Sequence, residues 1–186
     1  MPPAARLVRD FINSAEPQTG TDTFTSPTAL AAWCRGHGLL PRGTVLTQED
    51  LTVAITVREG LRAVLQSHAG HETPVAELSV LNEALDRIPL RASFDGAAVL
   101  RLRVGDERPL YAVIAALLDT IRESAKDGSW DRLKVCAKDS CRWAFYDGSR
   151  NRSGRWCSMA GCGNQIKMQR AHARTRQAAS KKEPEN

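Results

Sequence analysis

The chain has 186 residues and a mass of 20.4 kDa, enough for one ordinary hydrophobic core and a small additional module. Residues 1–130 carry 13 Lys+Arg and 16 Asp+Glu, a net charge of −3, whereas residues 131–186 carry 13 and 5, a net charge of +8. This split is typical of a nucleic-acid-binding module attached to another domain, although a solvated charged surface is the alternative. The first residues lack a secretory signal and no apolar run approaches the roughly 20 residues that cross a bilayer, so we expect a cytoplasmic protein with no membrane partner.

The apolar pattern of the N-terminal part predicts a mainly α-helical domain with one small β-hairpin, an α+β arrangement. Periodic apolar residues, N-cap signals and glycine stops predict helices near residues 6–15, 27–36, 47–68, 73–88 and 109–126. The turn-forming pair Asp95-Gly96 lies between two short strand patterns, at residues 92–94 and 98–104, and therefore predicts the hairpin.

Polar residues of this part are expected to have structural or solvated roles. Asn13 and Ser14 are interpreted as the end and cap of the first helix. The histidines, His68 among them, lie beside glycines without a spaced carboxylate or cysteine to complete a site, so we expect solvated imidazoles. Cys34 is expected to be a buried thiol on a helix.

Four cysteines, Cys136, Cys141, Cys157 and Cys162, form two pairs with four residues inside each pair and fifteen between the pairs. Each pair can bend into a knuckle that directs two thiolates at one point, and two knuckles complete a tetrahedral shell for one zinc ion. Such a shell leaves no open position for substrate, so the predicted zinc is structural. Two disulfides or buried thiols are the alternatives, which a reducing compartment disfavours.

Between the two cysteine pairs, residues 142–147 are predicted to form a strand that turns through residues 148–154, so that a hairpin separates the pairs. Trp143, Phe145 and Trp156 are expected to form the small core of this module, which buries too little surface to fold without its metal. Stacking of these aromatic side chains on exposed bases is the alternative.

A helix is predicted immediately after the last cysteine. Gly163 permits an unusual backbone angle, and Asn164 is expected to cap a helix that runs from Gln165 to about residue 178. Base contact by Asn164 is the alternative to capping. The module therefore consists of a knuckle, a hairpin and a helix.

The predicted helix carries a basic stripe. Lys167, Arg170 and Arg174 fall within about 60° of one another around its axis. Cations at this density neutralise phosphates, and the start of the helix is expected to read the major groove while the hairpin arginines contact the backbone. The residues expected to contact nucleic acid are Arg142, Arg150, Arg152, Arg155, Asn164, Gln165, Lys167, Arg170 and Arg174.

The cysteine-rich segment closely resembles the CGNR-type zinc finger of proposed bacterial transcription regulators. The resemblance is carried by Phe145-Tyr146-Asp147, Ser149-Arg150, Trp156-Cys157-Ser158-Met159, the tetrapeptide Cys162-Gly163-Asn164-Gln165, and Lys167. The tetrapeptide ends in glutamine where the family has arginine. Gln165 retains hydrogen bonding without the charge, so the preference at a nucleic-acid contact is expected to differ.

The N-terminal part resembles the ABATE domain that accompanies this finger. Asp10-Phe-Ile-Asn13-Ser, Thr25-Ser-Pro-Thr-Ala-Leu-Ala-Ala-Trp33 and Gly38-Leu-Leu40 carry this looser match, which implies a regulatory or ligand-sensing role. We divide the chain into an ABATE-like domain at residues 1–128, the finger with its basic helix at residues 129–178, and a disordered tail at residues 179–186.

These features predict a transcription regulator with one structural zinc ion that binds double-stranded DNA, its N-terminal domain serving for effector sensing or dimerisation. An RNA-binding or protein-interaction adaptor is the alternative. A single finger covers few base pairs, so a homodimer is expected from the need for specificity, and a small-molecule effector is left open. The sequence has no spaced carboxylate pair, nucleophile with a base, or Gly-rich phosphate loop, so we expect no enzymatic activity.

Overall fold

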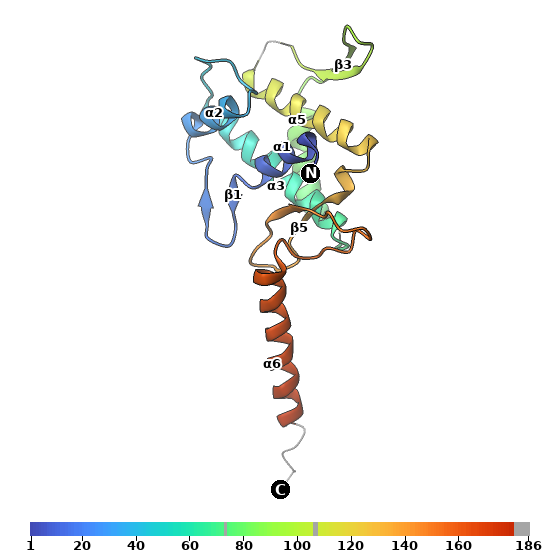
Figure 1. The fold of residues 1–186 in the computed structure, drawn as a ribbon. Helices are drawn as coiled ribbons and strands as arrows, with labels where there is room; N and C mark the ends of the chain where they lie inside the picture. The colour runs from blue at the N-terminus through green and yellow to red at the C-terminus, as the bar shows by residue number, and fades with distance from the viewer. Residues whose placement is uncertain (73, 106–107, 181–186) are drawn as a thin grey trace.

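A computed structural model describes residues 1–72, 74–105 and 108–180, and within them the chain is mainly helical (Figure 1). The helices are α1 (Pro3–Ile12), α2 (Pro27–Gly36), α3 (Gln48–His68), α4 (Val75–Asp86), α5 (Pro109–Lys126) and α6 (Asn164–Ser180). Three antiparallel hairpins pair β1 (Ala15–Glu16) with β2 (Thr21–Asp22), β3 (Arg91–Phe94) with β4 (Leu100–Arg103), and β5 (Leu133–Val135) with β6 (Ala144–Tyr146). The predicted fold class is confirmed.

Local signals place the starts of α2 and α3 where the sequence predicts them, whereas α1 begins at Pro3, before the predicted start at residue 6. Ser26 accepts a hydrogen bond from the Ala29 N–H at 3.1 Å and caps α2, which ends at Gly36. Thr47 and Asp50 form a reciprocal capping box at the start of α3. The predicted start of the fourth helix at Thr73 lies outside the described residues.

The hydrophobic core lies between α1, α3 and α5. Phe11, Leu65, Ile114 and Leu117 are among its fully buried side chains. Cys34 is buried in the same core from α2, as predicted. The tips of the β3–β4 hairpin and of α6 lie at opposite ends of the molecule in Figure 1, so the core separates them.

The zinc-finger hairpin belongs to this core. Leu133, Val135 and Ala144 are buried in the same cluster as α3 and α5. Trp143 and Trp156 instead pack around the cysteines, and Phe145 is half-buried outside both clusters. The predicted small aromatic core is confirmed for Trp143 and Trp156 and wrong for Phe145. The hairpin itself packs on the N-terminal domain, which offers it a larger apolar surface.

The partner of β6 also differs from the prediction. β6 pairs with β5, in a register that places Leu133 opposite Tyr146 and Val135 opposite Ala144, and not with residues 155–157. Of those residues, Arg155 contacts the segment just after β5 instead: its carbonyl oxygen accepts a hydrogen bond from the Ala137 N–H at 2.9 Å. The first knuckle is thus the connection inside the hairpin, because its sharp turn brings the two flanking strands together.

Three polar side chains join the N-terminal domain to the backbone of the finger. The Asn13 amide accepts from the Ala144 N–H and donates to the Ala144 carbonyl, both at 2.8 Å, and so acts as a neighbouring strand. Arg62, fully buried, donates to Ile12 O at 2.6 Å and to Arg142 O at 3.0 Å.

His68 makes the third of these contacts. Its Nδ1 lies 2.9 Å from Leu133 O, and its ring meets Trp130 edge-on at 5.1 Å. Asn13 is the C-cap residue of α1, as predicted, and its side chain in addition binds the finger. The expectation of a solvated His68 is wrong. Both side chains satisfy finger backbone groups that would otherwise be buried without partners.

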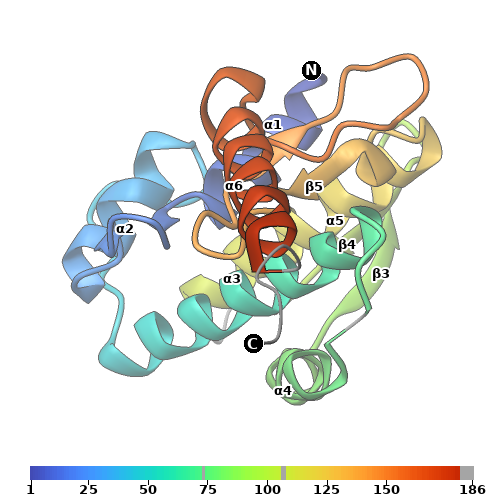
Figure 2. The ribbon, with the colours of Figure 1, turned by 90° about the horizontal axis from the view of Figure 1, so that it is seen from below.

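Helix α6 leaves the body next to β5 and extends away from it (Figures 1 and 2). From Lys167 to Arg176 every side chain is exposed. The helix continues to Ser180, past the predicted boundary at residue 179, and the rest of the predicted tail lies outside the described residues.

We expect Asn13→Ala to destabilise the protein by about 2 kcal/mol, because it leaves the N–H and carbonyl of the buried Ala144 unpaired. Denaturant unfolding of the zinc-loaded protein measures the change. Asn82→Ala, at an exposed position of α4, is the matched control and should change stability by less than about 0.5 kcal/mol. Equal effects of the two substitutions would contradict the structural role of Asn13.

Candidate metal centre and nucleic-acid interface

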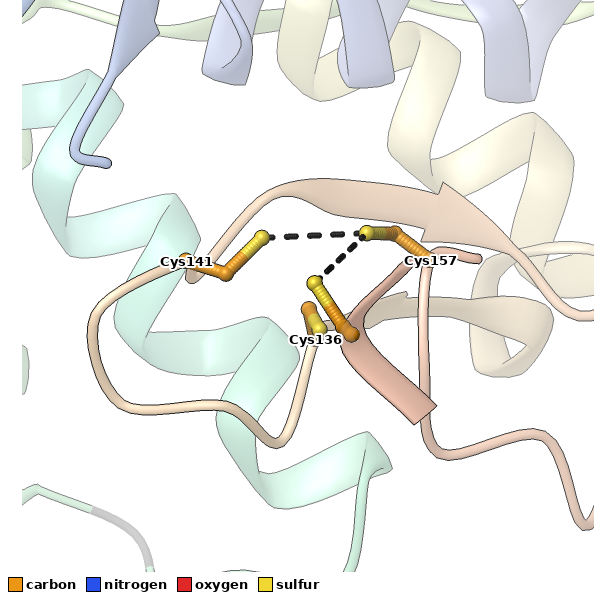
Figure 3. A group of neighbouring side chains, drawn as sticks. Cys136, Cys141 and Cys157 are labelled. Atoms are coloured by element: carbon orange, nitrogen blue, oxygen red, sulfur yellow. Dashed lines mark hydrogen bonds between the residues drawn. The ribbon is translucent and has the colours of Figure 1, made fainter. Parts of the chain in front are cut away.

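The four cysteine sulfurs converge on one point. All four Sγ atoms lie within 4.8 Å of one another, with 3.7 Å between Cys141 and Cys157 and 3.8 Å between Cys157 and Cys162. Zn–S bonds of about 2.3 Å in a tetrahedron place sulfurs about 3.8 Å apart. Figure 3 shows that the labelled Cys141 and Cys157 point toward each other from separate segments. The donor set and its spacing fit one structural zinc ion, as predicted.

The first knuckle is a tight turn between β5 and β6. The N–H groups of Cys141 and Arg142 both donate to Lys138 O, at 2.8 and 3.2 Å. Arg142 has a φ of 48°, in the left-handed region that L-residues other than glycine rarely adopt. Its carbonyl accepts from Arg62 at 3.0 Å, so the N-terminal domain supports the strained residue of the knuckle.

The second knuckle is built on a π-turn, Met159–Gly163, that leads directly into α6. Ser158 caps this turn by accepting from the Gly161 N–H at 3.1 Å. A Cβ on Gly163 would lie 2.9 Å from Met159 Sδ and 3.1 Å from Trp156 Cδ1. A side chain at this position would have to displace the exposed end of Met159. Gly163 has no positive φ, so the predicted unusual backbone angle is wrong.

The capping role predicted for Asn164 is also wrong. Asn164 has helical angles, with φ −67° and ψ −40°, and its side chain donates back to Ala160 O at 3.3 Å. The helical turn already begins at Met159, so the cap falls on Ser158. The metal ligand Cys162 therefore lies within the helical segment, and the direction of α6 is tied to the zinc.

At neutral pH, protons compete with zinc for the cysteine sulfurs, because zinc binds the thiolate form. Burial raises the pKa of Cys141 to about 11, and burial also raises the pKa of Cys157. Burial disfavours the Cys136 thiolate too, but hydrogen bonds from the backbone of Cys157 and Lys138 outweigh it and lower the Cys136 pKa. Zinc must therefore displace protons at Cys141 and Cys157.

A buried ion pair lies beneath the exposed loop that joins β6 to the second knuckle. Lys134 Nζ lies 2.8 Å from Asp147 Oδ2, and their side chains are only 7% and 3% exposed. The Asp147 carboxylate also accepts from the Ser149 N–H at 3.0 Å and the Gly154 N–H at 2.8 Å. Burial opposes ionisation of Asp147, but the hydrogen bonds from Lys134, Ser149 and Gly154 hold its pKa below the usual range.

Five of the nine residues predicted to contact nucleic acid fall in two exposed groups. Lys167, Arg170 and Arg174 are exposed along α6, and Arg150 and Arg152 are exposed on the loop between Asp147 and Gly154. These two groups flank the second knuckle, with Cys157 and Cys162, in the sequence, and this knuckle connects them.

The remaining predicted residues make contacts within the protein. The Arg155 guanidinium lies 5.7 Å from the Trp156 ring centroid, and Lys138 donates to Gln165 Oε1 at 2.7 Å. Arg142 faces the side-chain amide of Gln66 on α3, whose oxygen accepts from it at 2.9 Å in the orientation that satisfies both groups. Arg142 therefore lies at the junction with the N-terminal domain.

The sequence interpretation missed Lys134 and Asp147 as parts of the site. Lys134 lies between Leu133 and Val135, two buried apolar residues. A lysine inside so short an apolar strand is a signal that its charge needs a partner. The identity of that partner is not readable from the local pattern.

None of the helices in the part of the chain that the structure describes is long and apolar enough to span a membrane.

Comparison with protein families covers both parts of the chain. The model of the CGNR zinc finger matches residues 132–175. The model of the ABATE domain, described as a putative stress-induced transcription regulator, matches residues 5–128. A search of curated proteins gives no match. The two resemblances read from the sequence are confirmed.

We expect Cys157→Ser to abolish zinc binding and to release α6 from the body, because the second knuckle loses its metal. The β5–β6 hairpin should persist, since its apolar residues are buried in the N-terminal core. Elemental analysis of zinc and limited proteolysis of α6 test this. Cys34→Ala, which changes a buried cysteine outside the cluster, should retain zinc. Full zinc retention by Cys157→Ser would refute the ligand assignment.

Zinc affinity should fall steeply with decreasing pH. Cys141 and Cys157 have raised pKa values and are protonated at neutral pH, so binding releases at least two protons. Lowering the pH from about 8 to about 7 should weaken zinc binding by about 100-fold or more, since each displaced proton contributes a factor of about ten. Competition with a chromophoric chelator at the two pH values measures the change. A pH-independent affinity would contradict thiolate ligation.

Proposed function

Because the chain belongs to the ABATE family of transcription regulators and carries a CGNR zinc finger, we propose that it binds duplex DNA through α6. The observation that carries the proposal is the helix itself. Its side chains from Lys167 to Arg176 are exposed, and residues 164–180 include four Lys or Arg and no Asp or Glu. An exposed helix whose Lys and Arg side chains are not offset by any Asp or Glu fits the major groove, which is about 12 Å wide.

Zinc positions this helix for DNA and takes no direct part in recognition. Cys162 lies within the helical segment that becomes α6, so the metal fixes the direction in which the helix leaves the body. The stripe of Lys167, Arg170 and Arg174 contacts DNA along one face. This division of roles matches a site with four sulfur ligands, which has no position for substrate.

Gln165 contributes to base recognition as a donor. Its Oε1 accepts from Lys138 at 2.7 Å, and this leaves the side-chain NH₂ to face a partner. An arginine at this position would also offer donors, but it would place a second cation beside Lys138. We therefore propose that Gln165 selects base acceptors, such as guanine O6 or thymine O4, without adding charge.

The N-terminal domain is proposed to sense an effector at its junction with the finger, or to dimerise. A cavity of about 320 Å³ at this junction supports the sensing role. A small polar molecule bound there would contact both parts, and could therefore change the position of the first knuckle. The cavity is lined by Gln66, His71, Glu77, Val135, Cys136, Ala137, Asp139 and Arg142.

The DNA proposal predicts unequal effects of two neighbouring arginines on α6. Arg174 belongs to the stripe, whereas Arg176 points about 160° away from it around the helix axis. Both are exposed, so neither substitution should affect folding. Arg174→Ala should weaken binding to a fluorescent duplex several-fold in anisotropy titrations and make its salt dependence shallower by about 0.9, the value for one lost phosphate contact. Arg176→Ala should weaken it much less.

Three results would count against the proposal. The first is a failure of the zinc-loaded protein to bind duplex DNA at low salt. The second is tighter binding to single-stranded RNA than to duplex DNA, which would favour the adaptor alternative. The third result concerns the triple variant Lys167→Ala/Arg170→Ala/Arg174→Ala. Its salt dependence, log K against log[salt], should be shallower by about 2.7, and an unchanged slope would place DNA elsewhere on the protein.

A further inference from the structure

The loop between Asp147 and Gly154 is unusually well fixed for an exposed polar segment. Its sequence, Gly-Ser-Arg-Asn-Arg-Ser between these two residues, has no apolar side chain that could anchor it in a core. Arg152 nevertheless adopts a φ of 50°, which is unfavourable for a residue with a side chain. The surrounding structure therefore holds this loop in one shape.

The anchor is the buried pair of Lys134 and Asp147. Asp147 binds both ends of the loop, through the Ser149 N–H at 3.0 Å and the Gly154 N–H at 2.8 Å. The approach to Gly154 is so close that a Cβ there would lie 2.8 Å from the carboxylate. Replacing a buried ion pair by apolar residues of similar size is often neutral or stabilising. Stability alone therefore gives little reason for a charged pair here.

Lys134 and the neighbouring Arg132 hold the backbone carbonyl oxygens of the loop on one side. Lys134 Nζ donates to Arg152 O and, at 3.4 Å, to Gly154 O. Arg132 donates to Asp147 O at 3.0 Å and to Ser149 O at 2.9 Å. Four carbonyl oxygens, the negative ends of the peptide dipoles, are thus engaged by two cations on the inner side of the loop.

The outer side of the loop presents donors and positive charge. Arg150, Asn151 and Arg152 are exposed there. Arg152 lies 3.7 Å from Asp131, but both side chains are about half exposed or more, and such a pair is weak. A segment with its acceptors turned inward and its cations turned outward is suited to bind an anion.

We propose that Gly148–Gly154 is a phosphate-binding loop for the sugar–phosphate backbone, held in its binding shape by Lys134, Asp147 and Arg132. This inference rests on the proposed DNA-binding function and adds a second contact surface to α6. Lys134 and Asp147 are positioning residues, since they are buried and touch no DNA. Arg150 and Arg152 contact the phosphates, and the zinc-binding knuckle between loop and α6 fixes the two surfaces relative to each other.

The decisive variant replaces the ion pair without changing net charge. Lys134→Met/Asp147→Leu fills the same space with apolar side chains but removes the hydrogen bonds that the pair makes to the loop backbone. Thermal stability should therefore fall moderately, while zinc content should stay close to that of the wild type. The affinity of this variant for duplex DNA should nevertheless fall about tenfold, and the salt dependence should become shallower by about 1.8, the value for two lost phosphate contacts. Anisotropy titrations at several salt concentrations measure both quantities in the full zinc-loaded chain.

A second variant tests the same contacts without touching the core. Arg150→Gln/Arg152→Gln alters exposed side chains only and should reproduce the shallower salt dependence. Arg87→Gln, an exposed arginine at the end of α4, is the control for loss of a charge and should leave the slope nearly unchanged.

The outcomes separate this inference from the proposed function. If the wild type binds duplex DNA and both double variants keep its affinity and slope, the phosphate-binding loop is refuted while the role of α6 stands. If only Arg150→Gln/Arg152→Gln loses the contacts, and Lys134→Met/Asp147→Leu retains zinc and full binding, the positioning role of the ion pair is refuted. A wild type that binds no duplex DNA at low salt overturns both proposals.

Discussion

The structure depends on burial of the zinc-finger hairpin in the core of the N-terminal domain. Leu133, Val135 and Ala144 fill the space beside α3 and α5, which removes their apolar surface from water. The backbone groups that are buried with them find partners in Asn13, Arg62 and His68. Because these contacts are both apolar and hydrogen-bonded, the finger has one fixed position on the domain. The position of the elements that follow the hairpin, up to α6, depends on it.

In this arrangement the hydrophobic core and the metal stabilise different parts of the finger. The core orders β5 and β6, which a small isolated module could not bury by itself. The four thiolates order what lies outside the core, from the first knuckle to the start of α6. Since α6 is otherwise exposed, the zinc determines its direction, while the N-terminal domain determines where the whole finger is placed.

Charge follows the same division. Cations that are buried, such as Arg62 and Lys134, bind backbone carbonyls and shape the chain. Cations that are exposed, on α6 and on the loop after Asp147, have few partners within the protein and remain available to phosphates. The net charge of +8 in the C-terminal part thus contains two populations of basic residues that composition alone does not distinguish.

The sequence by itself determined the features that depend on local chemistry. Cysteine type and spacing identified the zinc ligands, cap residues identified the start of α2 and α3, and helical periodicity identified the basic stripe. Only the tertiary structure decided which distant groups meet. Asn13 binds Ala144 across 131 residues, β6 takes β5 as its partner, and Lys134 finds Asp147 beneath the loop. These pairings depend on the shape and free surface of the folded N-terminal domain, and no local pattern around either partner encodes that surface.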